Sequence, residues 1–222
     1  NDIDIDSLKS ESSNLKLQSK SLAEELDTVK IKISDLITKV PNIPDSKVPD
    51  GLSEENNIEV FRSSNFKESG YNLKNHWDLS KEYDIIDFEL GSKITGSGFP
   101  VYKDKGAKLQ RALINFFLDR NSSAGYSEFQ VPHLVNSDSA YATGQLPDKD
   151  GQMYHVINDD FYLIPTAEVP LTNIYRDKIL AVDQVPVKMT GYTPCFRREA
   201  GSYGSDVRGL NRLHQFDKVE IV

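Results

Sequence analysis

The chain has 222 residues, of which 38% are hydrophobic and 27% charged, a composition typical of a soluble globular protein. Its formal net charge of -8 argues against broad, non-specific nucleic-acid binding, which depends on neutralising phosphates, but it leaves room for a local basic site. No apolar run approaches the ~20 residues of a membrane-spanning helix, and the start lacks the pattern of a signal peptide, so we expect a cytoplasmic protein with no membrane contact.

A heptad pattern of apolar residues runs from Leu8 to Val40. One series is Leu8, Leu15, Leu22, Val29 and Leu36, and the other is Leu26, Ile33 and Val40. This spacing predicts a coiled-coil helix. A single helix cannot bury its own stripe, so its partner is another chain or a preceding helix. We favour a preceding helix, because the chain opens without methionine and stops within an apolar run, as a piece of a longer protein would.

A proline-rich connector follows this helix. Residues 41–51 contain three prolines and one glycine, a composition that ends a helix and favours an extended linker. We therefore divide the chain into a helical arm at residues 1–40, a linker at 41–51 and a second domain at 52–222.

The second domain mixes helical and strand periodicities. The predicted elements are a helix at 105–121, a strand at 127–135, a hairpin of strands at 153–156 and 161–164, a short helix at 167–175, and two long strands at 187–199 and 213–222 joined by a loop at 200–209. The helix at 167–175 contains Pro170, which is tolerated in a first turn.

The histidines and the cysteine do not suggest a metal site or a nucleophile. The single cysteine, Cys195, has no cysteine neighbour, and the four histidines lack the spacing of metal ligands. We expect Cys195 to be a small buried side chain and His214 to be a hydrogen-bonded structural residue.

Unusual side chains gather on the two long strands. Period-two geometry places these four on one face of the second strand: His214, Phe216, Lys218 and Glu220. Taken singly, each charge fits a solvated strand face. Together, Phe216 offers a stacking platform and Glu220 a carboxylate about 13 Å away, a span comparable to an aminoacyl nucleotide. If the hairpin register sets Glu199 near Phe216, Arg197 lies between the two ends, where its guanidinium would meet a phosphate.

Several segments, in this order, resemble the seryl-tRNA synthetases, a family of class II aminoacyl-tRNA synthetases. The matching segments are Gly106–Pro132 (motif 1), Thr166-Ala167-Glu168 (the serine-binding triplet), and Phe196-Arg197-Arg198-Glu199 with Arg208–Glu220 (motif 2). Two short motifs also resemble this family: His76-Trp77-Asp78-Leu79 and Arg111-Ala112-Leu113. The resemblance implies an α+β fold, an antiparallel sheet flanked by helices and incomplete here, preceded by one helix of an antiparallel coiled-coil arm.

The resemblance also implies roles for individual residues. Serine would be held by Thr166, Ala167, Glu168, Arg197 and Glu220, and ATP by Arg197, Arg198, Glu199, Arg212 and Phe216, with Arg208 as a further candidate for the outer phosphates. Arg197 would be the catalytic residue, bridging the serine carboxylate and the α-phosphate. Pro132 would lie at the interface of a homodimer.

The implied reaction joins serine to ATP, giving seryl-adenylate, and then transfers the seryl group to tRNA(Ser). Motif 3 and the acidic stretch that holds Mg²⁺ in the family have no counterpart here, so we expect this chain alone to be inactive. Two alternatives stay open: a related ligase that charges a carrier protein, and a non-catalytic dimeric interaction protein. The heptad segment favours the tRNA ligase, because carrier-protein ligases commonly lack the arm.

Overall fold

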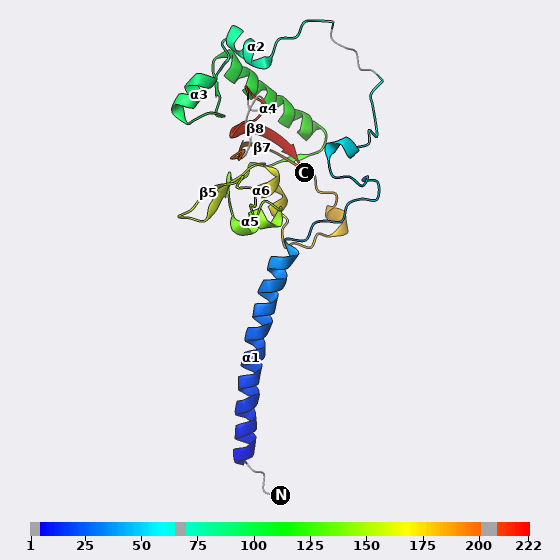
Figure 1. Ribbon diagram of the computed structural model, residues 1–222, viewed down its shortest axis with the longest axis vertical. Coiled ribbons are helices and arrows are strands. Elements are labelled where there is room, and N and C mark those ends of the chain that lie inside the picture. Colours follow the sequence, from blue (N-terminus) through cyan, green and yellow to red (C-terminus); the bar gives the residue numbers. More distant parts are fainter. Residues whose placement is uncertain (1–4, 65–69, 201–207) are drawn as a thin grey trace. The chain divides into compact units, whose positions relative to one another are not determined.

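The computed structural model describes residues 5–64, 70–200 and 208–222 (Figure 1). The chain divides into two compact units, residues 1–67 and residues 68–222. Within the described ranges, no helix is both long enough and apolar enough to cross a membrane.

The first unit contains one long helix, α1 (Ile5–Ile37), drawn in blue in Figure 1. Its 33 residues are all exposed, including the apolar stripe of the heptads. The predicted helix is thus confirmed, and its coiled-coil partner stays a prediction. Residues 41–51 form no helix or strand, and a short 3₁₀ helix, η1 (Glu54–Asn56), follows them.

The second unit begins with α2 (His76–Glu82), β1 (Ile86–Asp87), α3 (Phe88–Ile94), β2 (Val101–Tyr102) and α4 (Lys105–Ser123). Strands β1 and β2 pair antiparallel. Helix α4 confirms the helix predicted over 105–121. It can begin close to β1 because residue 106 is glycine: a Cβ at Gly106 would lie 2.1 Å from the carbonyl oxygen of Ile85.

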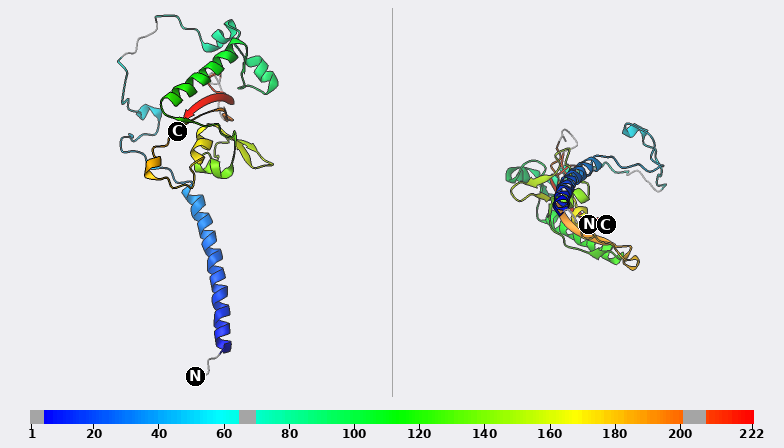
Figure 2. Two further views of the ribbon diagram at one scale, coloured as in Figure 1. Left: turned by 180° about the vertical axis from the view of Figure 1, so that it is seen from behind. Right: turned by 90° about the horizontal axis from the view of Figure 1, so that it is seen from below.

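The central sheet has the order β3-β7-β8, formed by β3 (Ser127–Glu128), β7 (Met189–Phe196) and β8 (Gln215–Ile221). Strand β3 pairs parallel to β7, whereas β7 and β8 pair antiparallel. Helix α4 packs on both β7 and β8 and is seen across them from the front in Figure 1 and from behind in Figure 2. The α+β class and the antiparallel hairpin are confirmed, and β3 adds a parallel edge that period-two patterning does not predict.

A third sheet has the antiparallel order β4-β6-β5, formed by β4 (Leu134–Asn136), β6 (Phe161–Leu163) and β5 (Tyr154–Val156). Its β5–β6 hairpin is the one predicted. The strand predicted over 127–135 is divided between β3 and β4, and Pro132, which cannot donate to a strand ladder, lies between them. The remaining helices are α5 (Ser137–Ala142), α6 (Glu168–Asn173) and η2 (Val182–Gln184).

The two long strands are shorter than predicted. Strand β7 ends at Phe196, although the strand periodicity of the sequence predicts that it continues to Glu199. Arg197 N–H still donates to His214 O at 2.9 Å, but the N–H of Arg198 donates to Gln152 O outside the sheet, and Glu199 has a left-handed backbone with φ 47°. The chain therefore leaves the sheet just before the predicted Glu199 position.

The core lies around α6, between the central sheet and the third sheet. One buried cluster is Val131, Ala167, Leu171 and Met189, and the other is Val135, Ala140, Ile164 and Val169. On β7, Thr190, Thr193 and Cys195 are fully buried, so the sheet interior holds hydroxyls and a thiol beside the apolar side chains.

Replacing Leu171 by alanine tests this core. Leu171 is fully buried, so the lost contacts and the cavity should lower the free energy of unfolding by about 2 to 5 kcal/mol in urea titrations. Ile157, which is 79% exposed, provides the matched control: its replacement by alanine should change that free energy by less than about 0.5 kcal/mol. Equal effects of the two substitutions would contradict the assigned core.

The thiol of Cys195 provides a second test. Burial raises the pKa of this thiol above its ordinary value, since it penalises the thiolate. We expect Cys195 to resist alkylation by iodoacetamide at pH 8 in the native protein and to react once the protein is unfolded in urea, as measured by peptide mass spectrometry. Native labelling as fast as that of a free cysteine would refute the buried position.

Candidate functional site

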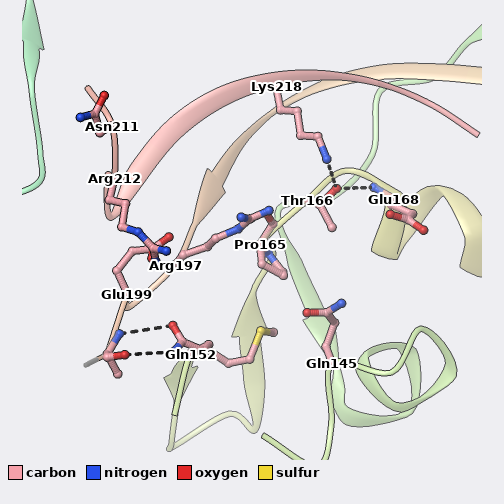
Figure 3. A pocket seen from close by; sticks show the side chains of 12 residues that line it. Gln145, Gln152, Pro165, Thr166, Glu168, Arg197, Glu199, Asn211, Arg212 and Lys218 are labelled. Carbon is pink, nitrogen blue, oxygen red and sulfur yellow. Dashed lines mark hydrogen bonds and ion pairs between the residues drawn. The ribbon is translucent and has the colours of Figure 1, made fainter. Parts of the chain in front are cut away.

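A cleft of about 670 Å³ opens where the ends of β6 and β7 meet the start of β8 and α6 (Figure 3). It is lined by Gln145, Gln152, Met153, Pro165, Thr166, Glu168, Arg197, Glu199, Ala200, Asn211, Arg212 and Lys218. Five of them are residues for which the sequence resemblance implies a ligand role: Thr166, Glu168, Arg197, Glu199 and Arg212.

The hydroxyl of Thr166 is the polar centre of one end of the cleft. Thr166 Oγ1 donates to Glu220 Oε2 at 2.7 Å and accepts from Lys218 Nζ at 3.1 Å. It also accepts from the backbone N–H of Glu168 at 3.2 Å, and Lys218 forms an ion pair with Glu220. Lys218 and Glu220 thus share one face of β8, as the alternation predicts. The carboxylate of Glu168 is exposed along the cleft wall.

Arg197 lies between the two halves of the cleft. Its Nε donates to the carbonyl oxygen of Pro165 at 3.3 Å, and its guanidinium carbon lies 5.1 Å from the ring centroid of Phe216. The carbonyl and the ring restrict the side chain from two directions, so the guanidinium is held in place. Figure 3 shows Arg197 beside Pro165. Such a fixed fork of donors suits a carboxylate or phosphate.

The register assumed from the sequence is wrong. Phe216 pairs with Cys195, not with the neighbourhood of Glu199. Because Glu199 has already left the strand, its carboxylate turns to Arg212 and forms an ion pair of 2.8 Å with it. Arg197 and Phe216 nevertheless meet, since Arg197 follows β7 by one residue and reaches back over the ring.

Four other candidates lie outside the lining of the cleft. Ala167 is fully buried beneath it, and Glu220 reaches it through its bond to Thr166. Phe216 lines a separate cavity of about 180 Å³ on the side of Phe99 and contacts the main cleft through Arg197. Arg198 is exposed and does not line the cleft.

The predicted loop at 200–209 is described only at its ends. Residues 201–207, with Gly201 and Gly204, lie outside the described residues. At the far end, the guanidinium of Arg208 lies 4.6 Å from the ring centroid of Trp77 and lines a different cavity. Arg208, the further candidate for the phosphates, is therefore not brought together with Arg212 in the cleft.

Sequence reasoning missed several lining residues. Alternation predicts the strand face of Lys218 but no ligand role for it. Nothing in the sequence points to Gln152, whose side chain donates to the carbonyl oxygen of Ala200 and accepts from its N–H, both at 3.3 Å. Gln145 and Asn211 also line the cleft. No local pattern could have found the glutamines, because they reach the cleft from a separate segment.

The rear face of β8 is joined to α4 by polar contacts. Asp217 accepts from Gln110 Nε2 and, at 2.6 Å, from the hydroxyl of Tyr192. Burial, followed by the hydrogen bond to Asp217, raises the pKa of Tyr192 above its ordinary value, so the phenol remains a donor. These contacts fix the strand from behind.

A second pair of contacts fixes the end of β8. The buried Thr190 hydroxyl donates to the carbonyl oxygen of Glu220 at 2.7 Å and accepts from Asn121 Nδ2 at 2.9 Å. The backbone of Glu220 is thereby tied to β7 and α4.

His214 serves the structural role expected of it. Its Nδ1 lies 2.8 Å from the hydroxyl of Tyr154, and its ring stacks on Phe99 with centroids 5.2 Å apart. Burial raises the pKa of the Tyr154 phenol. His214 thus fixes the entry to β8 and does not line the cleft.

The charges of the cleft suit a ligand that carries both signs. Arg197, Arg212 and Lys218 offer positive charge to carboxylate or phosphate oxygens, whereas Glu168 offers a carboxylate to an ammonium group. In the part of the chain that the structure describes, no group of three or more histidine, cysteine or acidic side chains is placed to hold a metal ion.

Comparisons with known proteins agree with this geometry. Residues 154–222 match the model of the tRNA synthetase class II core domain (G, H, P, S and T). The serine–tRNA ligase of Salinibacter ruber is 55% identical over 188 residues, which cover 85% of this chain and 44% of that protein. The serine–tRNA ligase of Solibacter usitatus is 52% identical over 203 residues, covering 91% of this chain and 48% of that protein.

Solved structures show the same relationship. The seryl-tRNA synthetase of Pyrococcus horikoshii, crystallised with ATP, superposes with a TM-score of 0.85 at 29% identity, over 98% of this chain and 53% of that one. The cytoplasmic serine–tRNA ligase of Naegleria fowleri, crystallised with AMP, superposes with a TM-score of 0.81 at 26% identity, over 96% and 51% of the two chains. The chain spans about half the length of the curated relatives it matches. It belongs to the seryl-tRNA synthetase family of class II aminoacyl-tRNA synthetases.

Proposed function

We propose that the natural protein that contains this sequence is a serine–tRNA ligase, which activates serine with ATP and transfers it to tRNA(Ser). The observation that carries the proposal is the position of Arg197, held by the carbonyl of Pro165 and the ring of Phe216 between the Thr166 end and the Arg212 end of one cleft. Relatives of this chain bear the name serine–tRNA ligase, and one related structure was crystallised with ATP.

The serine end of the ligand would lie at Thr166 and Glu168. Glu168 would receive the serine ammonium, since its carboxylate is exposed in the cleft. Glu220 would read the serine hydroxyl or amine, and its carboxylate is held by Thr166 and Lys218. Glu220 could accept from the serine hydroxyl, a hydrogen bond that an analogue without the hydroxyl cannot make. Ala167 would contribute only by shaping the turn from beneath.

The nucleotide end would lie along Arg197 and Arg212. Arg197 would contact the serine carboxylate and the α-phosphate, and Arg212 the outer phosphates. Phe216 would stack on adenine, and Glu199 would accept from the adenine amino group. The carboxylate of Glu199 is paired with Arg212, so ATP would have to exchange this ion pair for its own contacts. Arg198, exposed outside the cleft, is the weakest of the ATP assignments.

The reaction proposed for this cleft needs no protein nucleophile. An oxygen of the serine carboxylate attacks the α-phosphorus of ATP in line, the bond to the β-phosphate oxygen breaks, and pyrophosphate leaves. The guanidinium of Arg197 would stabilise the charge that develops on the α-phosphate, and its fixed position limits the reorganisation needed at that moment. The ribose hydroxyl at the end of tRNA(Ser) would then attack the seryl carbonyl and release AMP.

Magnesium would neutralise the phosphates of ATP in such a reaction. We place its protein ligands outside this chain, because the acidic stretch that holds Mg²⁺ in the family has no counterpart in the sequence.

Two exposed apolar surfaces support the partners that we propose. Helix α1 exposes its heptad stripe, and we assign residues 1–40 to one helix of a coiled-coil arm for tRNA(Ser), residues 41–51 to a linker and residues 52–222 to the catalytic domain. Helix α4 exposes Leu109, Leu113, Phe116 and Phe117. We assign this apolar surface, with Pro132, to the interface of a homodimer in the cytoplasm.

Calorimetric titration of the natural protein with a non-hydrolysable seryl-adenylate analogue tests the function. We expect the seryl analogue to bind about tenfold more tightly than the alanyl analogue, because of the hydroxyl contact. Arg197→Ala should weaken binding by roughly a hundredfold, since it removes a charged, hydrogen-bonding partner.

A matched arginine controls for this substitution. Arg62 is exposed in the first unit, where it pairs with Glu59, so Arg62→Ala should leave the affinity unchanged. Equal affinity for the seryl and alanyl analogues would refute the serine assignment. An effect of Arg62→Ala as large as that of Arg197→Ala would refute the role given to the cleft.

A further inference from the structure

The first two residues of α2 contact the chain where it returns toward β8. The N–H of Leu210 donates to Nε2 of His76 at 2.7 Å, although the two residues are 134 positions apart. Beside this bond, the guanidinium of Arg208 lies over the ring of Trp77 at 4.6 Å. His76 and Trp77 belong to the motif His76-Trp77-Asp78-Leu79. The proposed reaction gives this motif no role.

The approach at this contact is close enough to require glycine at position 209. A Cβ on Gly209 would lie 2.2 Å from Nε2 of His76, and the residue has φ +69°, a left-handed conformation. Because the imidazole accepts at Nε2, its proton resides on Nδ1 and the ring is neutral. The contact therefore depends on one acceptor atom and on the absence of a side chain opposite it.

The imidazole itself is held in place. His76 is the first residue of α2, its carbonyl oxygen accepts from the hydroxyl of the buried Ser80 at 2.7 Å, and its ring meets that of Trp77 edge to face at 4.9 Å. His76 and Trp77 are both half-buried. They form a fixed surface, which we call the α2 anchor.

The chain is fixed again just after this contact. The side chain of Leu213 is buried, and the N–H of His214 donates to the carbonyl oxygen of Gly98 at 2.9 Å. Only Asn211 and Arg212 lie between the two attachment points, and both line the cleft. Two fixed ends limit the backbone conformations open to these residues, and so the region that the long side chain of Arg212 can reach.

We propose that His76 and Trp77 are positioning residues that hold Arg208–Leu210 so that Arg212 is presented to the outer phosphates of ATP. This inference rests on the proposed function, in which Arg212 binds those phosphates. Neither anchor residue lines the cleft, so they act through the backbone at Leu210 and not by touching the ligand. Pre-ordering of Arg212 lowers the entropy lost when ATP binds.

This role predicts an effect confined to one part of the ligand. ATP carries the outer phosphates, so its binding depends on Arg212. A seryl-adenylate analogue carries only the α-phosphate position, so its binding does not depend on Arg212. Loss of the α2 anchor should therefore weaken the binding of ATP and leave the binding of the analogue unchanged. A general loss of folding would weaken both.

The test compares His76→Leu with His76→Gln in the natural protein that contains this sequence. Leucine removes the acceptor, whereas the amide oxygen of glutamine can accept from the N–H of Leu210 near the position of Nε2. In serine-dependent ATP–pyrophosphate exchange, we expect His76→Leu to raise the KM for ATP about tenfold, as loss of this contact implies. The affinity of His76→Leu for the seryl-adenylate analogue should stay within about twofold of the wild-type affinity. In His76→Gln, the KM for ATP should return close to the wild-type value.

Hydrogen exchange at the Leu210 amide follows the contact without relying on catalysis. It should be faster in His76→Leu than in the wild-type protein and slow again in His76→Gln. An unchanged KM for ATP with faster Leu210 exchange would overturn the positioning role, as would an equal loss of affinity for ATP and for the analogue. A wild-type protein without serine-dependent exchange would refute the proposed function itself, while the Leu210 measurement would still report whether His76 holds this segment.

Discussion

The antiparallel pairing of β7 with β8 is the constraint on which the rest of the site depends. Its register sets Cys195 opposite Phe216 and Gly191 opposite Glu220, and it separates the two faces of β8. One face carries Lys218, which lines the cleft, together with Phe216 and Glu220. The other face meets α4. A slip by one residue would exchange these faces and would place Asp217 in the cleft in place of Lys218.

The polar contacts behind the sheet explain how this register is kept. Asp217 joins β8 to Gln110 of α4 and to Tyr192 of β7, and Thr190 joins the backbone of Glu220 to α4 through Asn121. Thr190 is buried, so loss of a partner there would leave an unsatisfied group at a cost of about 1 to 3 kcal/mol. The helix assigned to the dimer interface therefore also supports the strand that carries the ligand face.

Periodicity in the sequence predicts the local elements well. The heptads predict α1, and alternation predicts the β5–β6 hairpin and the shared face of Lys218 and Glu220. It does not predict where a strand ends, because the end at Phe196 depends on tertiary bonds and on the left-handed backbone of Glu199. The assumed hairpin register was wrong because alternation does not distinguish pairings that differ by an even number of residues, and Phe216 pairs with Cys195. Gln152 and the α2 anchor could not be predicted either, since their contacts with Ala200 and Leu210 join distant segments.

The central claim is that one cleft, organised around Arg197, holds an amino acid and a nucleotide end to end. The most direct measurement is a crystal structure of the natural protein that contains this sequence, bound to the seryl-adenylate analogue. We expect the serine ammonium at Glu168, the guanidinium of Arg197 on the phosphate position, and adenine on Phe216. An analogue bound outside this cleft, or bound within it without contacting Arg197, would contradict this arrangement.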